Sequence, residues 1–225
     1  MRKQPTFPLP KGKLRNRILR TKGKPLDCGV KRVEITYRST IYHVLVSPTS
    51  TRLMVDCGWP GTFGLMKHEL ERKGLAPAEI DYVLVTHFHP DHAGVVEEMK
   101  REGARLLLVD AQLAHVARLR EYVKPDSGYL DIRTDDAVIL SAAESRAFLK
   151  GLGFEGEIVT TPGHSPDSVS LLLDAGDAFT GDLTHPGQLD PGDLVSRDSW
   201  QKLRERGAKR VLPAHGGAWF LQQSP

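Results

Sequence analysis

The feature that most constrains the fold is a dense group of histidine and aspartate residues directly after a short apolar run. The run DYVLVT at residues 81–86 predicts a strand covered on both faces, because its apolar residues are nearly continuous. The residues that follow include four candidate metal ligands: His87, His89, Asp91 and His92. Alternate residues of an extended segment face the same way, so His87 and His89 can bind one ion. The motif therefore predicts a metal site at the end of a buried strand.

Further candidate ligands indicate more than one ion. Pro90 suits the first turn of a helix, which would carry Asp91 and His92 to a neighbouring position. Three more candidates stand where other predicted strands end: His164, Asp182 and His215. Seven imidazole and carboxylate ligands exceed the four that a tetrahedral zinc ion accepts, so the pattern implies two metal ions.

The rest of the chain alternates short apolar runs with helical stretches. Strands are predicted at residues 33–37, 41–46, 53–55, 81–86, 105–109, 157–160, 168–173, 178–180 and 210–212, the first three antiparallel because their connections are short. Helices are predicted at residues 63–73, 92–102, from 110 onward, 142–150 and 199–206, and a long loop at 119–137. Strand-and-helix units repeated in two halves indicate two mixed sheets packed together with helices outside.

The charge is distributed unevenly along the 225 residues. The net charge is +3, but residues 1–24 carry nine Lys or Arg and no Asp or Glu, so the remainder is net acidic. We expect residues 1–32 to form a basic, partly flexible N-terminal arm, and residues 33–225 to form a single catalytic domain. Contact of the arm with nucleic acid is the alternative interpretation.

Neither a membrane span nor a secretory signal is evident in the sequence. The longest apolar run is far shorter than the roughly 20 residues that cross a bilayer, and no apolar segment follows the basic start. Cys28 and Cys57 are too few for a disulfide framework, so we expect reduced thiols, with Cys57 packed in the core. We expect a soluble, cytoplasmic protein without a membrane partner, and the sequence leaves a homodimer open.

Several blocks together resemble the metallo-β-lactamase-fold hydrolase superfamily: THFHPDHAG, TPGHSPDSVSLLL, FTGDLT and LPAHG. The resemblance covers about residues 33–217. It implies an α/β fold, a four-layer αββα sandwich of two mixed β-sheets with helices on the outer faces, and a dinuclear metal centre at one edge of the two sheets.

The resemblance also assigns roles to the candidate ligands. It implies that one ion binds His87, His89 and His164, that the second binds Asp91, His92 and His215, and that Asp182 bridges both. Asp56, in the block LMVDCG, matches an aspartate that orients a ligand histidine without binding metal. The alternative for Asp56 is a turn residue before Gly58.

A dinuclear metal-dependent hydrolase is the function that the resemblance implies. A metal-bridging hydroxide would attack an ester-type carbonyl of a small molecule, a lactone, ester or thioester, and Asp91 would orient that hydroxide or pass its proton to the leaving group. Zinc is the expected metal, with manganese or iron as alternatives. Asp182 stands where authentic β-lactamases carry Cys or lack the bridging acid. The expected relatives are therefore compact lactonases, thioesterases and glyoxalase-II-like members.

Two other functions stay open at this point. One is a metal-dependent phosphodiesterase or nuclease whose basic N-terminal arm contacts nucleic acid, although the acidic remainder of the chain argues against nucleic acid as a partner of the site. The other is a mononuclear iron enzyme similar to persulfide dioxygenases.

The substrate pocket is the least constrained part of the site. Aromatic residues in loops serve equally as cover for the core. The candidates for the pocket wall are Trp59, Phe88, Tyr122, Tyr129 and His185, the last of which is alternatively a solvent-exposed loop residue. Three histidines lie away from the motif blocks and are expected to be structural: His43, His68 and His115.

Overall fold

The structure is a computed structural model, and it describes residues 24–25 and 29–222. Most of the basic N-terminal arm lies outside these residues, so the division at residue 32 stays a prediction. Cys28 also lies outside them.

The first sheet combines an antiparallel half with a parallel half. Within the described residues its strand order is β1-β2-β3-β4-β5-β6-β7. The strands are β1 (Lys24–Pro25), β2 (Lys31–Tyr37), β3 (Thr40–Val46), β4 (Arg52–Val55), β5 (Tyr82–Leu84), β6 (Arg105–Val109) and β7 (Val138–Leu140). Pairing is antiparallel from β1 to β4 and parallel from β4 to β7. The antiparallel order predicted for the first three strands is thereby confirmed.

The second sheet is also mixed. Its described strands follow the order β12-β11-β10-β9-β8. They are β8 (Gly156–Thr160), β9 (Val169–Leu173), β10 (Asp177–Gly181), β11 (Arg210–Pro213) and β12 (Trp219–Phe220). Only the β10–β11 pair is parallel among them.

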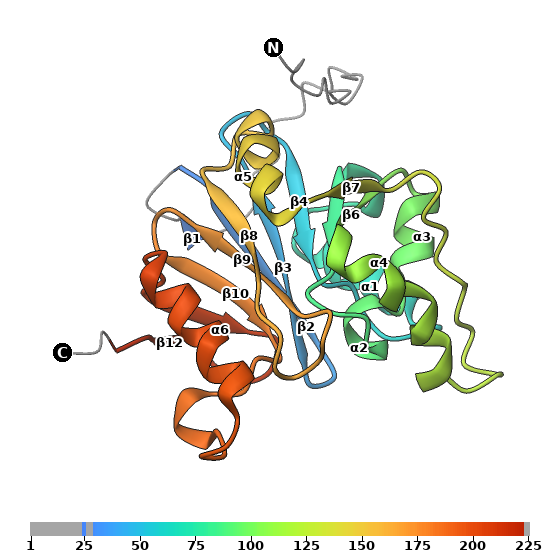
Figure 1. Cartoon of the computed structure of the whole chain (residues 1–225). Helices are drawn as coiled ribbons and strands as arrows, with labels where there is room; N and C mark the ends of the chain where they lie inside the picture. Colours follow the sequence, from blue (N-terminus) through green and yellow to red (C-terminus); the bar gives the residue numbers. More distant parts are fainter. Residues whose placement is uncertain (1–23, 26–28, 223–225) are drawn as a thin grey trace, which may run out of the picture.

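Three hydrophobic clusters define four layers. One cluster, which includes Leu53 and Leu171, lies between the sheets. A second packs the outer face of the first sheet against α1 (Phe63–Arg72) and α3 (Val96–Arg101). A third packs Trp200 of α6 (Leu194–Glu205) on the second sheet. Figure 1 shows α6 on one side of the molecule and α1 and α3 on the other, and the four-layer α/β sandwich is confirmed.

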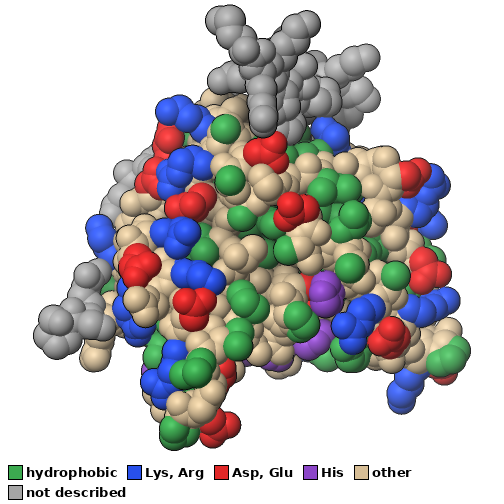
Figure 2. Space-filling model, in the orientation of Figure 1, with side chains coloured by type: hydrophobic (Ala, Val, Ile, Leu, Met, Phe, Trp, Pro, Cys, Tyr) green, Lys and Arg blue, Asp and Glu red, His purple; other side chains and the backbone are tan. Residues whose placement is uncertain are grey.

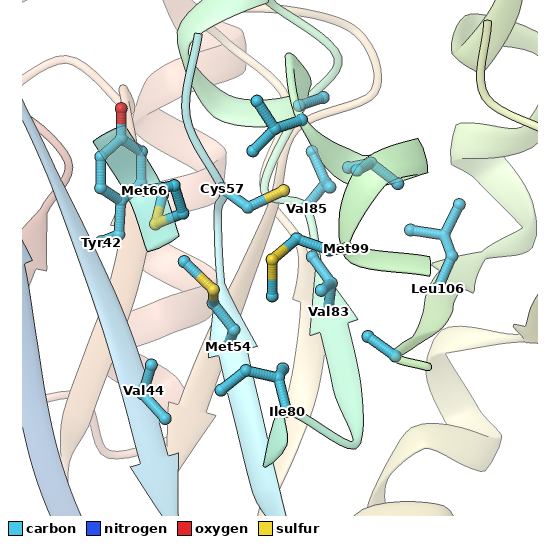
Figure 3. Close-up of a cluster of buried hydrophobic side chains, with 14 of the residues drawn as sticks. Tyr42, Val44, Met54, Cys57, Met66, Ile80, Val83, Val85, Met99 and Leu106 are labelled. Atoms are coloured by element: carbon cyan, nitrogen blue, oxygen red, sulfur yellow. The ribbon is translucent and has the colours of Figure 1, made fainter. Parts of the chain in front are cut away.

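Sulfur-containing side chains fill much of the cluster beneath α1 and α3. Met54, Met66, Met99 and Cys57 are fully buried there and lie close together in Figure 3. The predicted core position of Cys57 is confirmed, and its thiol is free. Among the described helices, none combines the length and the apolar character needed to cross a lipid bilayer.

Backbone hydrogen bonds join the two sheets at one edge. The amide of Val169 in β9 donates to the carbonyl of Thr86, just after β5, at 2.8 Å. The amide of Ile41 in β3 donates to the carbonyl of Ala214, just after β11, also at 2.8 Å. These bonds fix the strand ends of the two sheets relative to one another.

The helix predicted at residues 92–102 is divided into α2 (Pro90–Ala93) and α3. The cause is a contact with the loop that follows β4. The amides of Gly94 and Val95 donate to the carbonyls of Gly58 and Cys57 in that loop, at 2.8 and 3.2 Å. These donors are therefore not available to continue one regular helix. The prediction of a single helix was wrong because the competing carbonyls come from a segment distant in sequence.

The contact with the loop after β4 requires glycine at position 94, so replacement of Gly94 by alanine should destabilise the fold. A Cβ at this position would collide with backbone and ring atoms of Pro60 and with the carbonyl of Pro90. We expect Gly94→Ala to lower the free energy of unfolding by about 1–3 kcal/mol, measured by urea denaturation. Gly64→Ala is the matched control, because Gly64 lies in α1 with open space around it and alanine favours the helix. Equal stability of the two variants would contradict the prediction.

Other boundaries differ at short or irregular elements. The short strands β1, β7 and β12 were not predicted. The helix α6 begins at Leu194, where Asp193 caps it, before the predicted start at residue 199. The predicted helix from residue 110 is a series of short turns: η2 (Asp110–Gln112), α4 (Leu113–Val116) and η3 (Ala117–Tyr122). The predicted capping box of Ser141 and Glu144 is present at the start of α5 (Ala142–Gly151).

Candidate metal centre

The seven candidate ligands meet at one edge of the sandwich. They follow strands of both sheets: His87 and His89 come after β5, Asp91 and His92 lie in α2, His164 lies between β8 and β9, Asp182 follows β10 and His215 follows β11. Figure 2 shows histidine side chains reaching the surface in this region. Their ligand atoms fall into two groups, each with all atoms within 4.8 Å of one another.

The first group contains three histidine nitrogens. His89 Nδ1 lies 3.1 Å from His87 Nε2 and 3.0 Å from His164 Nε2. Ligands about 2.0–2.1 Å from a tetrahedral ion are separated by about 3.3 Å, so these three nitrogens have the spacing of one coordination shell.

The second group contains two histidines and two aspartates. Asp91 Oδ2 lies 3.3 Å from His92 Nε2 and 3.1 Å from His215 Nε2. Asp182 Oδ1 lies 3.4 Å from each of the same two nitrogens. The four donor atoms of the second group are therefore also spaced to bind a single ion.

Asp182 connects the two groups. While its Oδ1 faces His92 and His215, its Oδ2 lies 3.6 Å from His164 Nε2 and 4.0 Å from His87 Nε2. Gly181 makes this possible, since its φ is +55° and a Cβ there would collide with the Thr86 side chain. The end of β10 can therefore approach the end of β5.

Two buried atoms show that the donor set suits a cation. His92 Nε2 and Asp182 Oδ1 are inaccessible to solvent and have no hydrogen-bond partner among the described residues. Buried polar atoms without partners are costly in proteins. A divalent ion between them would satisfy both, so the residues present fit the metal that the sequence motif implies.

Asp56 holds His92 from behind. Its Oδ2 accepts a hydrogen bond from His92 Nδ1 at 2.9 Å. Its Oδ1 accepts one from the Thr86 amide at 2.7 Å, and the Thr86 hydroxyl also donates to the carboxylate. When His92 is neutral and its Nδ1–H donates to Asp56, the Nε2 lone pair is free for a metal. Asp56 also has a φ of +59°, a left-handed backbone conformation directly after β4.

The tip of the β2–β3 hairpin supports two other candidate ligands. His215 Nδ1 donates to the Ser39 carbonyl at 2.8 Å, and the buried Thr40 hydroxyl donates to Asp91 Oδ2 at 3.1 Å. No sequence pattern indicated these contacts, because Ser39 in the turn and Thr40 at the start of β3 lie outside every motif block.

The charges of the cluster complement a divalent ion. Burial is the main effect that lowers the pKa of His87 well below its ordinary value, and the charges of the neighbouring histidines lower it further. Burial raises the pKa of Asp182, but the neighbouring His92 outweighs this effect, so that the pKa lies below its usual range. His87 is therefore neutral and Asp182 ionised at pH 7, as metal ligation requires.

His92 has the opposite shift. Burial alone would lower its pKa, but the carboxylates of Asp56, Asp182 and Asp91 outweigh this effect and hold the pKa well above its ordinary value. Without metal, His92 therefore keeps a second proton at neutral pH. A metal ion that binds Nε2 has to displace that proton.

An open cavity of about 570 Å³ adjoins the cluster. Its wall includes His164, Asp182 and His215 together with His185, Gln188 and Trp219. The His185 ring packs against the Trp219 ring at a tilt of 56°, with centroids 4.4 Å apart. His185 is exposed and lines this cavity, a position compatible with a residue of the pocket wall and with a solvent-exposed loop residue.

The other candidate pocket residues are divided between site and core. Tyr122 is 52% exposed, and its ring centroid lies 5.1 Å from that of His89. Phe88 is buried in the hydrophobic cluster but also lines a small cavity beside His89. Tyr129 packs in the same hydrophobic cluster, and Trp59 lies under the guanidinium of Arg38. The structure therefore brings Tyr122 and Phe88 to the metal cluster and Tyr129 to the core.

Two residues near the site had not been expected there. His115, expected to be structural, lines the small cavity beside His89 and lies 4.0 Å from Asp167. Asp167 is buried and accepts a hydrogen bond from the Phe88 amide at 2.7 Å. The sequence feature that could have identified Asp167 is its position in the block TPGHSPDSVSLLL, three residues after His164. His43 is buried against Phe179, and His68 is exposed on α1.

Comparison with known proteins gives a family and several relatives. A family model described as the metallo-beta-lactamase superfamily matches residues 40–215. A probable metallo-hydrolase of Methanocaldococcus jannaschii is 29% identical over 73% of this chain and 82% of its own length. A beta-lactamase-like protein 2 homolog of Drosophila melanogaster is 28% identical over 76% of this chain and 57% of its own length.

Solved structures share the fold at low sequence identity. A metallo-beta-lactamase family protein from Thermus thermophilus is 19% identical with a TM-score of 0.63, and the match covers 84% of this chain and 74% of that one. The BLEG-1 B3 metallo-beta-lactamase is 20% identical with a TM-score of 0.62, covering 85% and 93%. These matches show the fold alone.

Proposed function

The chain belongs to the metallo-beta-lactamase superfamily, and on that premise we propose that it is a hydrolase that binds two divalent ions and cleaves an ester-type carbonyl of a small molecule. The single observation that carries the proposal is the pair of ligand groups joined by Asp182. Imidazole and carboxylate donors without a thiolate suit zinc, with manganese or iron as alternatives.

The ligand roles follow the two groups. His87, His89 and His164 would hold one ion, Asp91, His92 and His215 the other, and Asp182 would contribute one oxygen to each. When bound, the ions would supply a water of lowered pKa and polarise the substrate carbonyl.

Asp91 is proposed as the residue that manages the proton. Its carboxylate accepts a hydrogen bond from Thr40, and its pKa lies far below the usual range because the neighbouring His92 outweighs the effect of burial. An ionised Asp91 can accept a proton from the attacking water. The water oxygen forms a bond to the carbonyl carbon, the bond to the leaving oxygen or sulfur breaks, and the proton passes to that atom. The products are an acid and an alcohol or thiol.

The adjoining cavity supports a small substrate. At about 570 Å³ it has the size of ordinary small-molecule sites, and it opens directly on His164, Asp182 and His215. His185 and Trp219 would contact the acyl part of such a substrate, and Tyr122 and Phe88 would contact a group on the His89 side.

Metal content and a substrate panel test the proposal. We expect about two metal ions per chain by elemental analysis, and hydrolysis of a homoserine lactone or an acyl thioester that a chelator abolishes and zinc restores. The panel also contains a phosphodiester and a β-lactam, each with a metal-free control.

Three results would contradict the proposal. Full activity of a metal-free preparation would exclude metal-dependent hydrolysis. Faster cleavage of the phosphodiester than of any carbonyl compound would favour the phosphodiesterase alternative. One iron ion per chain with no hydrolysis would favour the mononuclear alternative.

A further inference from the structure

The hairpin between β2 and β3 ends in a two-residue turn at the edge of the metal cluster. Tyr37 pairs with Thr40, so Arg38 and Ser39 form the turn. The Ser39 carbonyl holds His215, and Thr40 holds Asp91. Arg38 is therefore adjacent in the chain to residues that contact two candidate ligands.

Arg38 has a backbone conformation that does not suit its side chain. Its φ is +54°, in the left-handed region where glycine is favoured and other residues are strained by about 1–2 kcal/mol. Two-residue hairpins of this kind usually have Gly or Asn at such a position. Strained residues that persist beside a functional site often take part in the function.

The Arg38 guanidinium is held in place but not neutralised. Its Cζ lies 5.5 Å from the centroid of the Trp59 ring. Trp59 is itself fixed, since its amide donates to the Tyr37 hydroxyl at 3.3 Å and its carbonyl accepts from Thr62. Arg38 is exposed, and among the described residues no carboxylate lies within 4.0 Å of it. By contrast, Arg118 in the small cavity beside His89 has Glu121 at 3.8 Å.

We propose that Arg38, in the turn whose Ser39 carbonyl contacts His215, binds an acidic group of the substrate, a carboxylate or a phosphate. No hydrogen bond or ion pair of the Arg38 N–H donors to a described residue is present, and the fork of these donors matches the paired oxygens of either acid. The proposal rests on the proposed hydrolase function and adds a substrate class: esters, lactones or thioesters that carry a negative charge away from the scissile bond.

The test compares two substrates within each enzyme. The zinc-loaded enzyme is assayed with a glutaryl thioester and with its neutral terminal-amide analogue, and a thioester with a terminal phosphate distinguishes the two acids. We expect the wild type to prefer an acidic substrate, and Arg38→Gly to reduce the ratio of kcat/KM values about ten- to hundredfold, the worth of a charge-assisted hydrogen bond. Arg38→Lys should retain part of the preference.

Arg105→Gln is the matched control. Arg105 also lies over an aromatic ring, that of Tyr82, at 6.0 Å, but at the start of β6, away from the metal cluster. Its substitution should leave the ratio unchanged. An unchanged ratio in Arg38→Gly, or equal losses for both substrates, would overturn the proposal.

A binding measurement separates this proposal from the proposed function. Titration calorimetry with glutarate, and separately with inorganic phosphate, should show weaker binding to Arg38→Gly than to the wild type even if neither thioester is hydrolysed. Hydrolysis of the neutral substrate without any difference in glutarate or phosphate binding would support the hydrolase and overturn the role of Arg38.

Discussion

Replacing Asp182 by alanine is expected to lower kcat/KM by more than about a hundredfold and to release metal at the same time. Its two carboxylate oxygens face both ligand groups, at 3.4 Å from His92 and His215 and at 3.6 Å from His164. The loss should exceed the roughly 10–100-fold that outer hydrogen-bond partners of a metal site contribute. Elemental analysis and steady-state kinetics on the same preparation would measure both effects.

Asp190→Ala is a suitable control for this variant. Asp190 is an exposed aspartate in the segment that follows η4 (Pro186–Gln188), so its substitution changes the net charge equally. We expect it to keep two ions and full activity. Retention of both ions by Asp182→Ala would show that Asp182 does not hold the pair together.

The second large effect is expected from Asp56→Asn, a change that preserves the shape of the side chain but replaces one acceptor oxygen by an NH₂ donor. Asparagine can still accept from the Thr86 amide through its oxygen, but its NH₂ group would then face His92 Nδ1. His92 would have to place its proton on Nε2, the atom that faces Asp91 and Asp182. We expect a roughly 10–100-fold loss of metal affinity, measured by competition with a chromogenic chelator.

Asp81→Asn provides the comparison for Asp56→Asn. Asp81 also accepts a backbone hydrogen bond, from the Arg52 amide at 2.7 Å, but it precedes β5 at the end opposite the site. Its substitution should leave metal affinity unchanged. Equal metal affinity in both variants would mean that Asp56 has only a structural role, through its hydrogen bonds to Thr86 after β5.

The candidate ligands could be identified from the sequence because they stand in loops that leave strands, and the structure brings these residues together. In His87-Phe-His89-Pro-Asp91-His92 the spacing alone separates two ligand pairs, and the structure places them in the two groups. Asp182 and His215 were found in the same way, each directly after a predicted strand. These positions depend on local chain direction, which short motifs determine.

Features that depend on contacts between distant segments were not predictable. The break between α2 and α3 is caused by carbonyls of residues 57 and 58, and no local pattern indicates such partners. The contact of Thr40 with Asp91 joins residues 51 positions apart. Tyr122 and Tyr129 occupy one predicted loop, yet only Tyr122 reaches the cluster, because packing against the core decides which ring is covered.

The hydrogen bonds that join the two sheets have a consequence for the dynamics of the site. Val169–Thr86 and Ile41–Ala214 connect the sheets at the strand ends that carry the candidate ligands. Separating the sheets at this edge would break both bonds and expose the core, so these amides should exchange their hydrogens only when the whole domain opens. We therefore expect local opening of the sandwich to begin away from this edge, and the spacing within the ligand groups to be kept while it occurs.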